Sequence, residues 1–370
     1  GPPLFTASIV CTASQGISGH RWSSEPKMPL VEHNALPAFE KLRQHGEKVL
    51  TLEQAVHQDI RELHVGLLNM MPDAALVATE IQFMRLVGGS NQIVQFFIHP
   101  FTVHGLPRSA QTQEYIDRYY RTFEQIQESG LDALIITGAN VSTPSLDQEP
   151  FWTPLSEVIA WAQGHVTSVL CSCLASHALL KLLYHIDREP MPDKLWGVFP
   201  HRIADREHRL LRDINTRFDV PHSRWNAIHR EPLERAGLTI LIDSDVAGVH
   251  LAVSPDQHSL VFFQGHPEYD TNSLLKEYKR KINLFVDGKR DDYPPHPENY
   301  FDEDASTIAE RYKAAVVRAL NEGEALPSFP EAHLEPLLDN TWRDTTKSIV
   351  NNWLGLVYER SAYEAPHPQP

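Results

Sequence analysis

The stretch from Val166 to Leu183 constrains the fold of this chain most strongly, because it combines a short apolar run with a helical repeat. The run Val166–Leu170 predicts a buried strand, and Cys173 follows it directly. Apolar side chains then recur at spacings of three and four, which predicts a helix: Leu174, Ala178, Leu179, Leu182 and Leu183. A cysteine at a strand-to-helix turn has its sulfur near the positive end of a helix, which lowers the thiol pKa and favours a nucleophile. The alternative interpretation of a lone cysteine is a small packing residue.

The alternation of strand and helix extends over the first half of the chain. Strands are predicted at 64–72, 93–98, 134–136 and 166–170, with helices at 36–56, 76–87, 115–126 and 152–162. This spacing predicts an α/β fold with an open, mostly parallel sheet that has helices on both faces. After Tyr184, four short apolar runs predict an antiparallel edge or a β-rich extension of the same sheet: 195–203, 238–243, 249–253 and 260–263.

The chain is predicted to form one main domain with appendages. Residues 1–27 are rich in Ser, Ala and Thr, and we expect them to be a disordered extension or the remnant of a cleaved tag. We expect the main domain to span residues 28–300. Residues 301–370 carry two further helical patterns and are predicted to form a C-terminal helical extension packed on that domain.

Charge and cysteine content exclude several classes of function. The formal net charge of the 370 residues is −15, which argues against a nucleic-acid partner or an anionic membrane surface. No run approaches the ~20 apolar residues of a membrane helix. The three cysteines, Cys11, Cys171 and Cys173, form neither a disulfide framework nor a zinc-binding spacing, so we expect no metal and a reducing, cytoplasmic setting.

Three marked sequences follow predicted strands and are expected to meet at one edge of the sheet. They are the glycine turn 137–139, Cys173, and the segment His266-Pro267-Glu268. In parallel α/β sheets, ligands bind at the carboxyl ends of the strands. We therefore predict one active site built from these three segments.

The residue types in this site match the needs of nucleophilic catalysis. The Cys173 thiol needs a base to become a thiolate, and His266 is the candidate. The Glu268 carboxylate can fix the imidazole tautomer and stabilise its cation. Backbone N–H groups at the turn and beside the nucleophile are predicted to bind an oxyanion: those of Gly138, Ala139 and Leu174.

The order of glycine turn, cysteine elbow and Gly-His-Pro-Glu resembles the class I glutamine amidotransferase-like fold. More closely, the chain resembles the homoserine O-succinyltransferase/O-acetyltransferase family from about Met28 to about Glu359. The resemblance rests on six stretches: Leu67–Pro72, Thr79–Phe83, Asp132–Ala139, His165–Ser168, Pro221–Arg224 and Gly265–Asp270.

The resemblance implies a reaction and a set of residue roles. Cys173 would carry the acyl group as a thioester, His266 would accept protons, and Glu268 would support His266. The implied substrate contacts are Lys194, Ser223 and Arg280. The implied reaction is ping-pong transfer of an acyl group from acyl-CoA to the hydroxyl of L-homoserine, in methionine biosynthesis. The family implies no bound cofactor, since acyl-CoA is a co-substrate, and it leaves a homodimer possible.

The sequence leaves two acyl groups open, succinyl and acetyl. Ser142 falls on the position that helps to choose it in the family, and a small uncharged residue there favours succinyl over acetyl. The loop 73–78 lacks the lysine that the family carries there and begins with Asp73, which leaves acetyl transfer to homoserine or serine as the alternative. More distant alternatives are a glutamine amidotransferase, a γ-glutamyl hydrolase and a non-enzymatic binding protein. Residues 302–336 resemble an inserted interface or surface segment.

Overall fold

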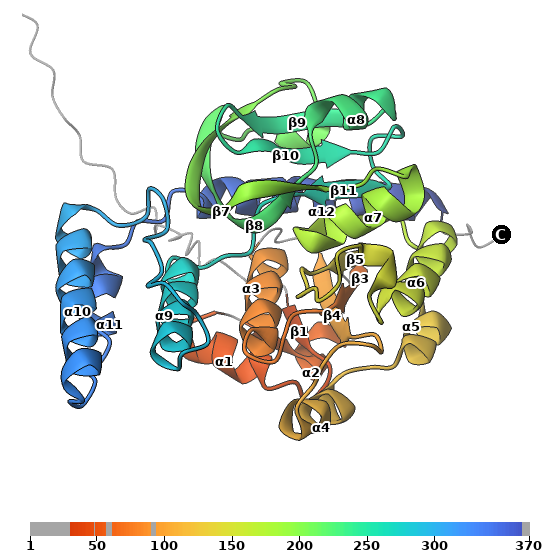
Figure 1. Ribbon diagram of the computed structural model, residues 1–370. Helices are drawn as coiled ribbons and strands as arrows, with labels where there is room; N and C mark the ends of the chain where they lie inside the picture. The colour runs from red at the N-terminus through yellow and green to blue at the C-terminus, as the bar shows by residue number, and fades with distance from the viewer. Residues whose placement is uncertain (1–29, 48, 57–60, 90–93, 365–370) are drawn as a thin grey trace, which may run out of the picture.

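The computed structural model describes residues 30–47, 49–56, 61–89 and 94–364, and one eleven-stranded sheet organises them (Figure 1). The extension predicted for residues 1–27 lies outside the described residues. The strands are β1 (Leu30–Glu32), β2 (Val49–Thr51), β3 (Glu62–Leu68), β4 (Gln95–Phe101), β5 (Ala133–Ile136), β6 (Ser168–Ser172), β7 (Glu189–Ile203), β8 (Arg217–Ala227), β9 (Thr239–Ser244), β10 (Gly248–Val253) and β11 (Leu260–Phe263). Their order across the sheet is β2-β1-β4-β3-β5-β6-β11-β10-β9-β7-β8.

Helices pack on this sheet and extend beyond it. They are α1 (Ala38–Gln44), α2 (Leu52–Val56), α3 (Leu76–Gly88), α4 (Ala110–Tyr119), α5 (Phe123–Ser129), α6 (Trp152–His165), α7 (Leu174–Tyr184), α8 (Arg230–Arg235), α9 (Ser273–Val286), α10 (Glu303–Glu322), α11 (Glu331–Leu334) and α12 (Arg343–Glu364), with short 3₁₀ turns at 146–148, 209–211 and 335–337. None of the described helices is long and apolar enough to cross a membrane.

The sheet confirms the predicted α/β class. The seven strands from β2 to β11 pair in parallel, and β10, β9, β7 and β8 continue the sheet as antiparallel neighbours. β11 joins the two halves, because it runs parallel to β6 and antiparallel to β10. In this register Phe263, at the end of β11, lies opposite Ser172 at the end of β6. The carboxyl ends of these two strands therefore lie side by side.

Two local predictions are wrong, and one strand was not predicted. Residues 36–56 are not continuously helical, because Val49–Thr51 forms β2 against β1 before α2 begins. The helix predicted at 115–126 is two helices, since Thr122 begins α5 with a reciprocal capping box to Gln125. Strand β8 has no counterpart in the prediction. Its alternation of polar and apolar residues is interrupted by Pro221, and its long pairing with β7 is a nonlocal contact.

The C-terminal helix is part of the core. Trp353 of α12 is completely buried, and its Nε1 donates a hydrogen bond to Ser168 Oγ at 2.8 Å. The three helices that precede α12 in the chain, α9, α10 and α11, share a separate apolar cluster that includes Trp196 and Trp342. Figure 1 shows α10 and α11 at one edge of the molecule. The division into residues 28–300 and 301–370 remains a prediction.

Candidate active site

Cys173 occupies a sharp bend between β6 and α7. Its backbone has φ 52° and ψ −111°, a conformation that residues other than glycine adopt rarely. The bend is held because the Cys173 N–H donates a hydrogen bond to Phe263 O on the neighbouring β11 at 2.8 Å. Strain of this kind at a strand-to-helix turn is typical of a nucleophile elbow. The predicted turn and its helix are both confirmed.

The two cysteines of this segment differ in their surroundings. Cys171 lies within β6, is completely buried in the apolar core, and has a thiol pKa that burial raises. Such a thiol is inert. Cys173 lies one residue beyond the strand, where a histidine contacts it. The structure thus separates a packing cysteine from a candidate nucleophile.

His266 and Glu268 adjoin Cys173, as the sequence predicts. His266 Nδ1 lies 2.8 Å from Glu268 Oε1, and both side chains are buried. This contact directs the other ring nitrogen, Nε2, toward the Cys173 sulfur, with which His266 shares a hydrogen bond. Ser172 Oγ donates a second hydrogen bond to the carboxylate, at Oε2 and 3.1 Å. Cysteine, histidine and glutamate thus form a connected triad.

Electrostatics in the triad favour a thiolate and an imidazolium. Burial alone would raise the pKa of Cys173, but the charge of His266 and its hydrogen bond lower it overall. Burial would likewise lower the pKa of His266, but the Cys173 and Glu268 charges raise it well above its ordinary value. The proton therefore resides on His266 rather than on the sulfur, which leaves Cys173 nucleophilic.

The glycine turn lies beside the reactive pair. A Cβ placed on Gly138 would lie 3.8 Å from Cys173 Cβ and 3.9 Å from His266 Cε1. Among the described residues, the backbone N–H groups of Gly138 and Leu174 have no hydrogen-bond acceptor. Leu174 is the first residue of α7, whose positive end faces the site. The role of Gly138, Ala139 and Leu174 in an oxyanion hole remains a prediction.

Two of the expected substrate contacts converge on Glu277 of α9, which the sequence reasoning missed. Ser223 Oγ donates to Glu277 Oε2 at 2.8 Å, and Lys194 Nζ lies 4.0 Å from the same oxygen. Trp196 Nε1 also donates to this oxygen, at 2.8 Å. Burial alone would raise the pKa of Glu277, but Lys194 and the hydrogen bonds lower it, so the side chain is a carboxylate.

A tyrosine connects this cluster to the triad. The Tyr269 hydroxyl donates a hydrogen bond to Glu277 Oε1, and its ring stacks on the His266 imidazole with 4.2 Å between ring centroids. His266 and the Glu277 cluster are therefore neighbouring parts of one site. The only local signal for Tyr269 is its place directly after the Gly-His-Pro-Glu segment.

Arg280 lies apart from these contacts. Its side chain is exposed, and it makes no hydrogen bond or ion pair with any residue that the structure describes. The neighbouring Lys281 instead places Nζ 3.6 Å from the centroid of the Trp196 ring. The substrate-binding role of Arg280 remains a prediction.

The position expected to influence acyl choice lies on a loop anchored by a buried carboxylate. Ser142 is exposed, and its backbone N–H donates to Glu149 Oε1 at 2.6 Å. The backbone N–H and hydroxyl of Thr143 donate to the same oxygen. Burial would raise the pKa of Glu149, but these hydrogen bonds lower it. The Ser142 side chain itself brings no charge to this loop.

The loop without a lysine obtains a cation from elsewhere in the chain. Arg108 Nη1 donates to Met71 O at 2.6 Å and lies 3.4 Å from Asp73 Oδ1. The Arg108 side chain is only 6% exposed, and its Nε and Nη2 have no hydrogen-bond partner among the described residues. Met71 in turn adjoins the glycine turn, since a Cβ on Gly138 would lie 3.4 Å from its sulfur.

A second buried arginine, Arg224, contributes its charge to the surroundings of Cys173. Arg224 donates to Asn226 O at 2.8 Å and to Ala247 O at 2.7 Å. In the described part of the chain, no carboxylate forms an ion pair with it, and its charge contributes to lowering the Cys173 pKa. Sequence reasoning noted Arg224 only as part of the Pro221–Arg224 motif.

Three buried histidines are the cluster in the described residues that most resembles a metal site: His201, His222 and His250. His201 Nδ1 donates to Phe199 O, whereas Nδ1 of His222 accepts from Arg224 Nε and Nδ1 of His250 accepts from the Gly265 N–H. The last two rings, neutral because burial lowers their pKa, therefore carry their proton on Nε2. Metal-binding histidines show the reverse pattern, in which the second nitrogen is the donor. These hydrogen bonds fit a neutral array, in which His222 donates to His201, better than a metal centre.

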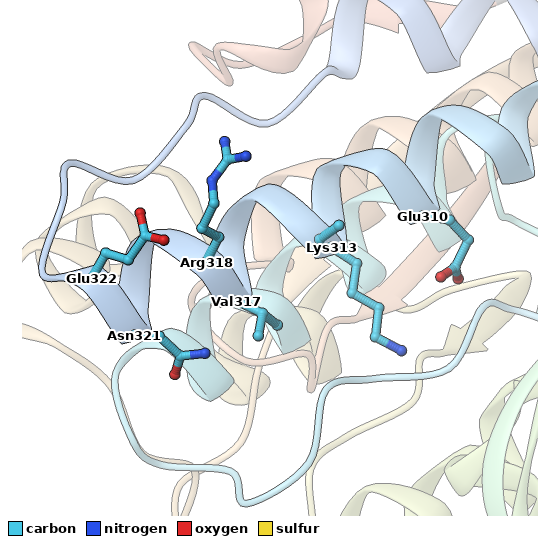
Figure 2. A pocket seen from close by; sticks show the side chains of 7 residues that line it. Glu310, Lys313, Val317, Arg318, Asn321 and Glu322 are labelled. Carbon is cyan, nitrogen blue, oxygen red and sulfur yellow. The ribbon is translucent and has the colours of Figure 1, made fainter.

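A surface hollow on α10 lies away from this chemistry. Its lining comes from α10 alone and includes Glu310, Lys313, Val317 and Arg318, as Figure 2 shows. In Figure 1, α10 and α7 lie at separate parts of the molecule. The hollow contains none of the triad residues, so the candidate active site is the buried group around Cys173.

Comparison with known proteins assigns the family. The family model described as homoserine O-succinyltransferase matches residues 29–363. The chain is 57% identical over 332 residues to the homoserine O-succinyltransferase of Methylococcus capsulatus, covering 90% of this chain and 94% of that protein. It is 58% identical over 341 residues to the enzyme of that name from Methylobacter tundripaludum, covering 92% and 96%.

Solved structures with a similar arrangement are more distant. A glutamine amidotransferase from Thermotoga maritima is 13% identical with a TM-score of 0.43, and the match covers 82% of this chain and 100% of that one. The family assignment therefore rests on the sequence matches, which extend over nearly the whole chain. This chain belongs to the homoserine O-succinyltransferase family.

Proposed function

We propose that this protein transfers a succinyl group from succinyl-CoA to the hydroxyl of L-homoserine, through a thioester on Cys173. The observation that carries the proposal is the buried contact of Cys173, His266 and Glu268 at adjoining strand ends. The names of the relatives at 57% and 58% identity support the acyl donor and the acceptor. The proposed reaction has two half-reactions that share one base.

In the first half-reaction, the Cys173 thiolate attacks the carbonyl carbon of the succinyl thioester. The oxyanion that forms is stabilised by the N–H groups of Gly138 and Leu174, which have no other acceptor among the described residues. The bond to the coenzyme A sulfur then breaks. His266 gives its Nε2 proton to that sulfur, so free coenzyme A leaves and a neutral imidazole remains.

In the second half-reaction, His266 works as a base. Acylation removes the thiolate charge, which is one of the causes of the raised His266 pKa, while burial continues to lower it. The neutral imidazole accepts the hydroxyl proton of homoserine as the oxygen attacks the thioester. Cys173 leaves as a thiolate, and the starting charges are restored.

The acyl pocket suits a carboxylate-bearing group. Ser142 adds no negative charge that would repel a succinyl carboxylate. Arg108 has its Nε and Nη2 unpartnered, and this edge of a guanidinium is the one that binds a carboxylate with two hydrogen bonds. We infer that Arg108 receives the distal carboxylate of the succinyl group. An acetyl group would leave Nε and Nη2 of Arg108 without a hydrogen-bond partner.

The acceptor side is less completely defined by contacts. Lys194 and Ser223 lie together at Glu277, which fits an amino acid that carries both charges. Arg280 would have to turn inward to take part. Oligomeric state and cytoplasmic location remain predictions.

Steady-state kinetics test the proposed function. Initial rates measured over a grid of succinyl-CoA and homoserine concentrations should give parallel double-reciprocal lines, as ping-pong transfer requires, with O-succinylhomoserine as the product. Product formation only with acetyl-CoA would contradict the acyl assignment. Glutamine hydrolysis without acyl transfer would contradict the proposed function as a whole.

A further inference from the structure

Two lysines from different elements meet beside Trp196, close to the catalytic histidine. Lys281 of α9 places Nζ 3.6 Å from the centroid of the Trp196 ring, and Lys194 of β7 places Nζ 5.6 Å from the same centroid. The positive charge of Lys194 also acts on Lys281 and lowers its pKa. Like charges that share one ring at a partly buried position repel each other, so an additional anion would stabilise the pair.

The surrounding charges do not compensate this pair fully. Glu277 is the carboxylate near Lys281, and it lies 4.0 Å from Lys194. Hydrogen bonds from Trp196, Ser223 and Tyr269 already occupy it. Arg290 adds a further positive charge near Lys281 and is itself paired with Asp292. Two ammonium groups and one carboxylate leave room for one more anion.

We propose that Lys281, together with Lys194 and the face of Trp196, binds the α-carboxylate of the acceptor amino acid. This inference rests on the proposed acyl transfer and adds a binding residue to it. A cluster that contains both positive and negative side chains suits a zwitterionic amino acid, because Glu277 lies beside the lysines and attracts the α-ammonium group. A succinyl group or a coenzyme A phosphate carries only negative charge there and would be repelled by Glu277.

The position of the cluster agrees with this assignment. The path from the lysines to the reaction centre runs through Glu277 to Tyr269, whose ring stacks on His266. His266 is the base that must take the acceptor's hydroxyl proton. An acceptor held by its carboxylate at the lysines is thereby directed toward His266.

The protonation of Lys281 supports the same role. Burial and the adjoining Lys194 lower the pKa of Lys281 to about 7. A bound carboxylate would raise this pKa again, because an opposite charge favours the ammonium form. Acceptor binding should therefore weaken as the pH rises above neutral, when Lys281 loses its charge.

Lys279 provides a matched control on the same helix. Its ammonium group is 3.2 Å from Glu331 Oε2 and lies over the ring of Phe329, so it has the same kind of contacts with its charge already balanced. Replacing Lys279 with methionine removes an equal charge from α9 without touching the Trp196 cluster. The informative variants are Lys281→Met, Lys281→Arg and Lys279→Met, each checked for an unchanged thermal unfolding midpoint.

The test separates the two half-reactions in single-turnover experiments. For Lys281→Met, we expect acylation of Cys173 by succinyl-CoA to stay within about twofold of wild type. The homoserine concentration that half-saturates discharge of the acyl-enzyme should rise roughly 10- to 100-fold, the range of a lost charge-assisted hydrogen bond. Lys281→Arg should retain most of the affinity, and Lys279→Met should behave as wild type.

An acceptor analogue without the carboxylate gives a second readout. Discharge by 3-aminopropan-1-ol should be weak in wild type and should change little in Lys281→Met, since the group that Lys281 binds is missing. An equal loss for homoserine and for this analogue would overturn the proposal, because the lysine would then act on something other than the carboxylate.

Three further results would each bear on the proposed role of Lys281 or on the proposed function. If Lys281→Met slows acylation by succinyl-CoA but not by acetyl-CoA, the lysine binds the succinyl carboxylate and the assignment to the acceptor is wrong. If neither half-reaction changes, the cluster is no substrate site. Absence of any acylation in wild type is a different result, since it contradicts the proposed function itself.

Discussion

His266 Nδ1 lies 2.8 Å from Glu268 Oε1 in a buried pair, and this contact fixes which ring nitrogen faces the nucleophile. With Nδ1 committed to the carboxylate, Nε2 is the nitrogen that exchanges protons with Cys173. Glu268 also stabilises the imidazolium that stands opposite the thiolate. One carboxylate therefore affects both the orientation and the charge of the His266 ring.

The charge state of Cys173 predicts how its rate of alkylation depends on pH. Its thiol pKa is lowered and the His266 pKa is raised, so the thiolate–imidazolium pair persists between those two values. Alkylation of Cys173 by iodoacetamide, followed by peptide mass spectrometry, should remain fast below pH ~8.5, the ordinary thiol pKa. The rate should fall only as the pH drops through the lowered value. A His266→Asn variant should shift this profile to higher pH, because burial then raises the Cys173 pKa without the opposing charge of His266. An unchanged profile in that variant would contradict the ion pair.

Replacing Glu268 with glutamine keeps the shape of the side chain but removes its charge. We expect kcat to fall about 10²- to 10⁴-fold, since the imidazolium loses its counter-charge and its fixed tautomer. Ser172→Ala is the control, because it removes only the 3.1 Å hydrogen bond to Glu268. It should lower the free energy of unfolding by about 0.5–1.5 kcal/mol. Equal kinetic losses in the two variants would show that the Glu268 charge is not what matters.

Alanine substitutions at two glycines should affect different properties: Gly138→Ala should lower activity, and Gly265→Ala should lower stability. In Gly138→Ala the new methyl group contacts Cys173 and His266 at ordinary distances of 3.8 and 3.9 Å, so the protein should fold while the space beside the sulfur shrinks and kcat/KM falls. In Gly265→Ala the methyl group would lie 2.8 Å from Val220 Cγ1 and 2.9 Å from His250 Nδ1. Overpacking of this kind costs about 1–3 kcal/mol in the free energy of unfolding. Urea unfolding and steady-state rates on both variants check this, and full activity in Gly138→Ala would contradict the placement of the turn.

Arg108 should discriminate between acyl donors. Arg108→Met removes the unpartnered Nε and Nη2, so kcat/KM for succinyl-CoA should fall roughly tenfold or more while that for acetyl-CoA changes little. Arg118→Met is a suitable control, because Arg118 is exposed on α4. Equal losses with both donors would indicate that Arg108 acts only by holding Met71 and Asp73 in place.

The sequence was sufficient to predict that Cys173, His266 and Glu268 lie together, because these residues follow buried strands. Cys173 comes directly after a short apolar strand, and His266 follows another within three residues of Phe263. The parallel pairing of β11 with β6 then brings the two strand ends together. The local sequence pattern does not predict this pairing. From the pattern, residues 260–263 were expected only in an antiparallel edge or a β-rich extension of the sheet.

The acceptor side of the site was harder to predict for the same reason. Glu277 and Lys281 are ordinary charged residues on an amphipathic helix, and nothing in their spacing distinguishes them from Lys279 or Arg280. Their importance arises from contacts with Trp196 and Ser223, which lie more than fifty residues earlier. Such contacts depend on how α9 packs against β7 and β8, and no local signal determines that packing.

The central claim is that the acyl group resides on Cys173 between the half-reactions, and the mass of the intact protein tests it most directly. After mixing with succinyl-CoA alone, the protein should gain the mass of one succinyl group, located on the peptide that contains Cys173. Addition of homoserine should remove it and release O-succinylhomoserine. Cys173→Ser should not complete this cycle. Transfer to homoserine without any adduct on Cys173, or an adduct on another residue, would contradict the account.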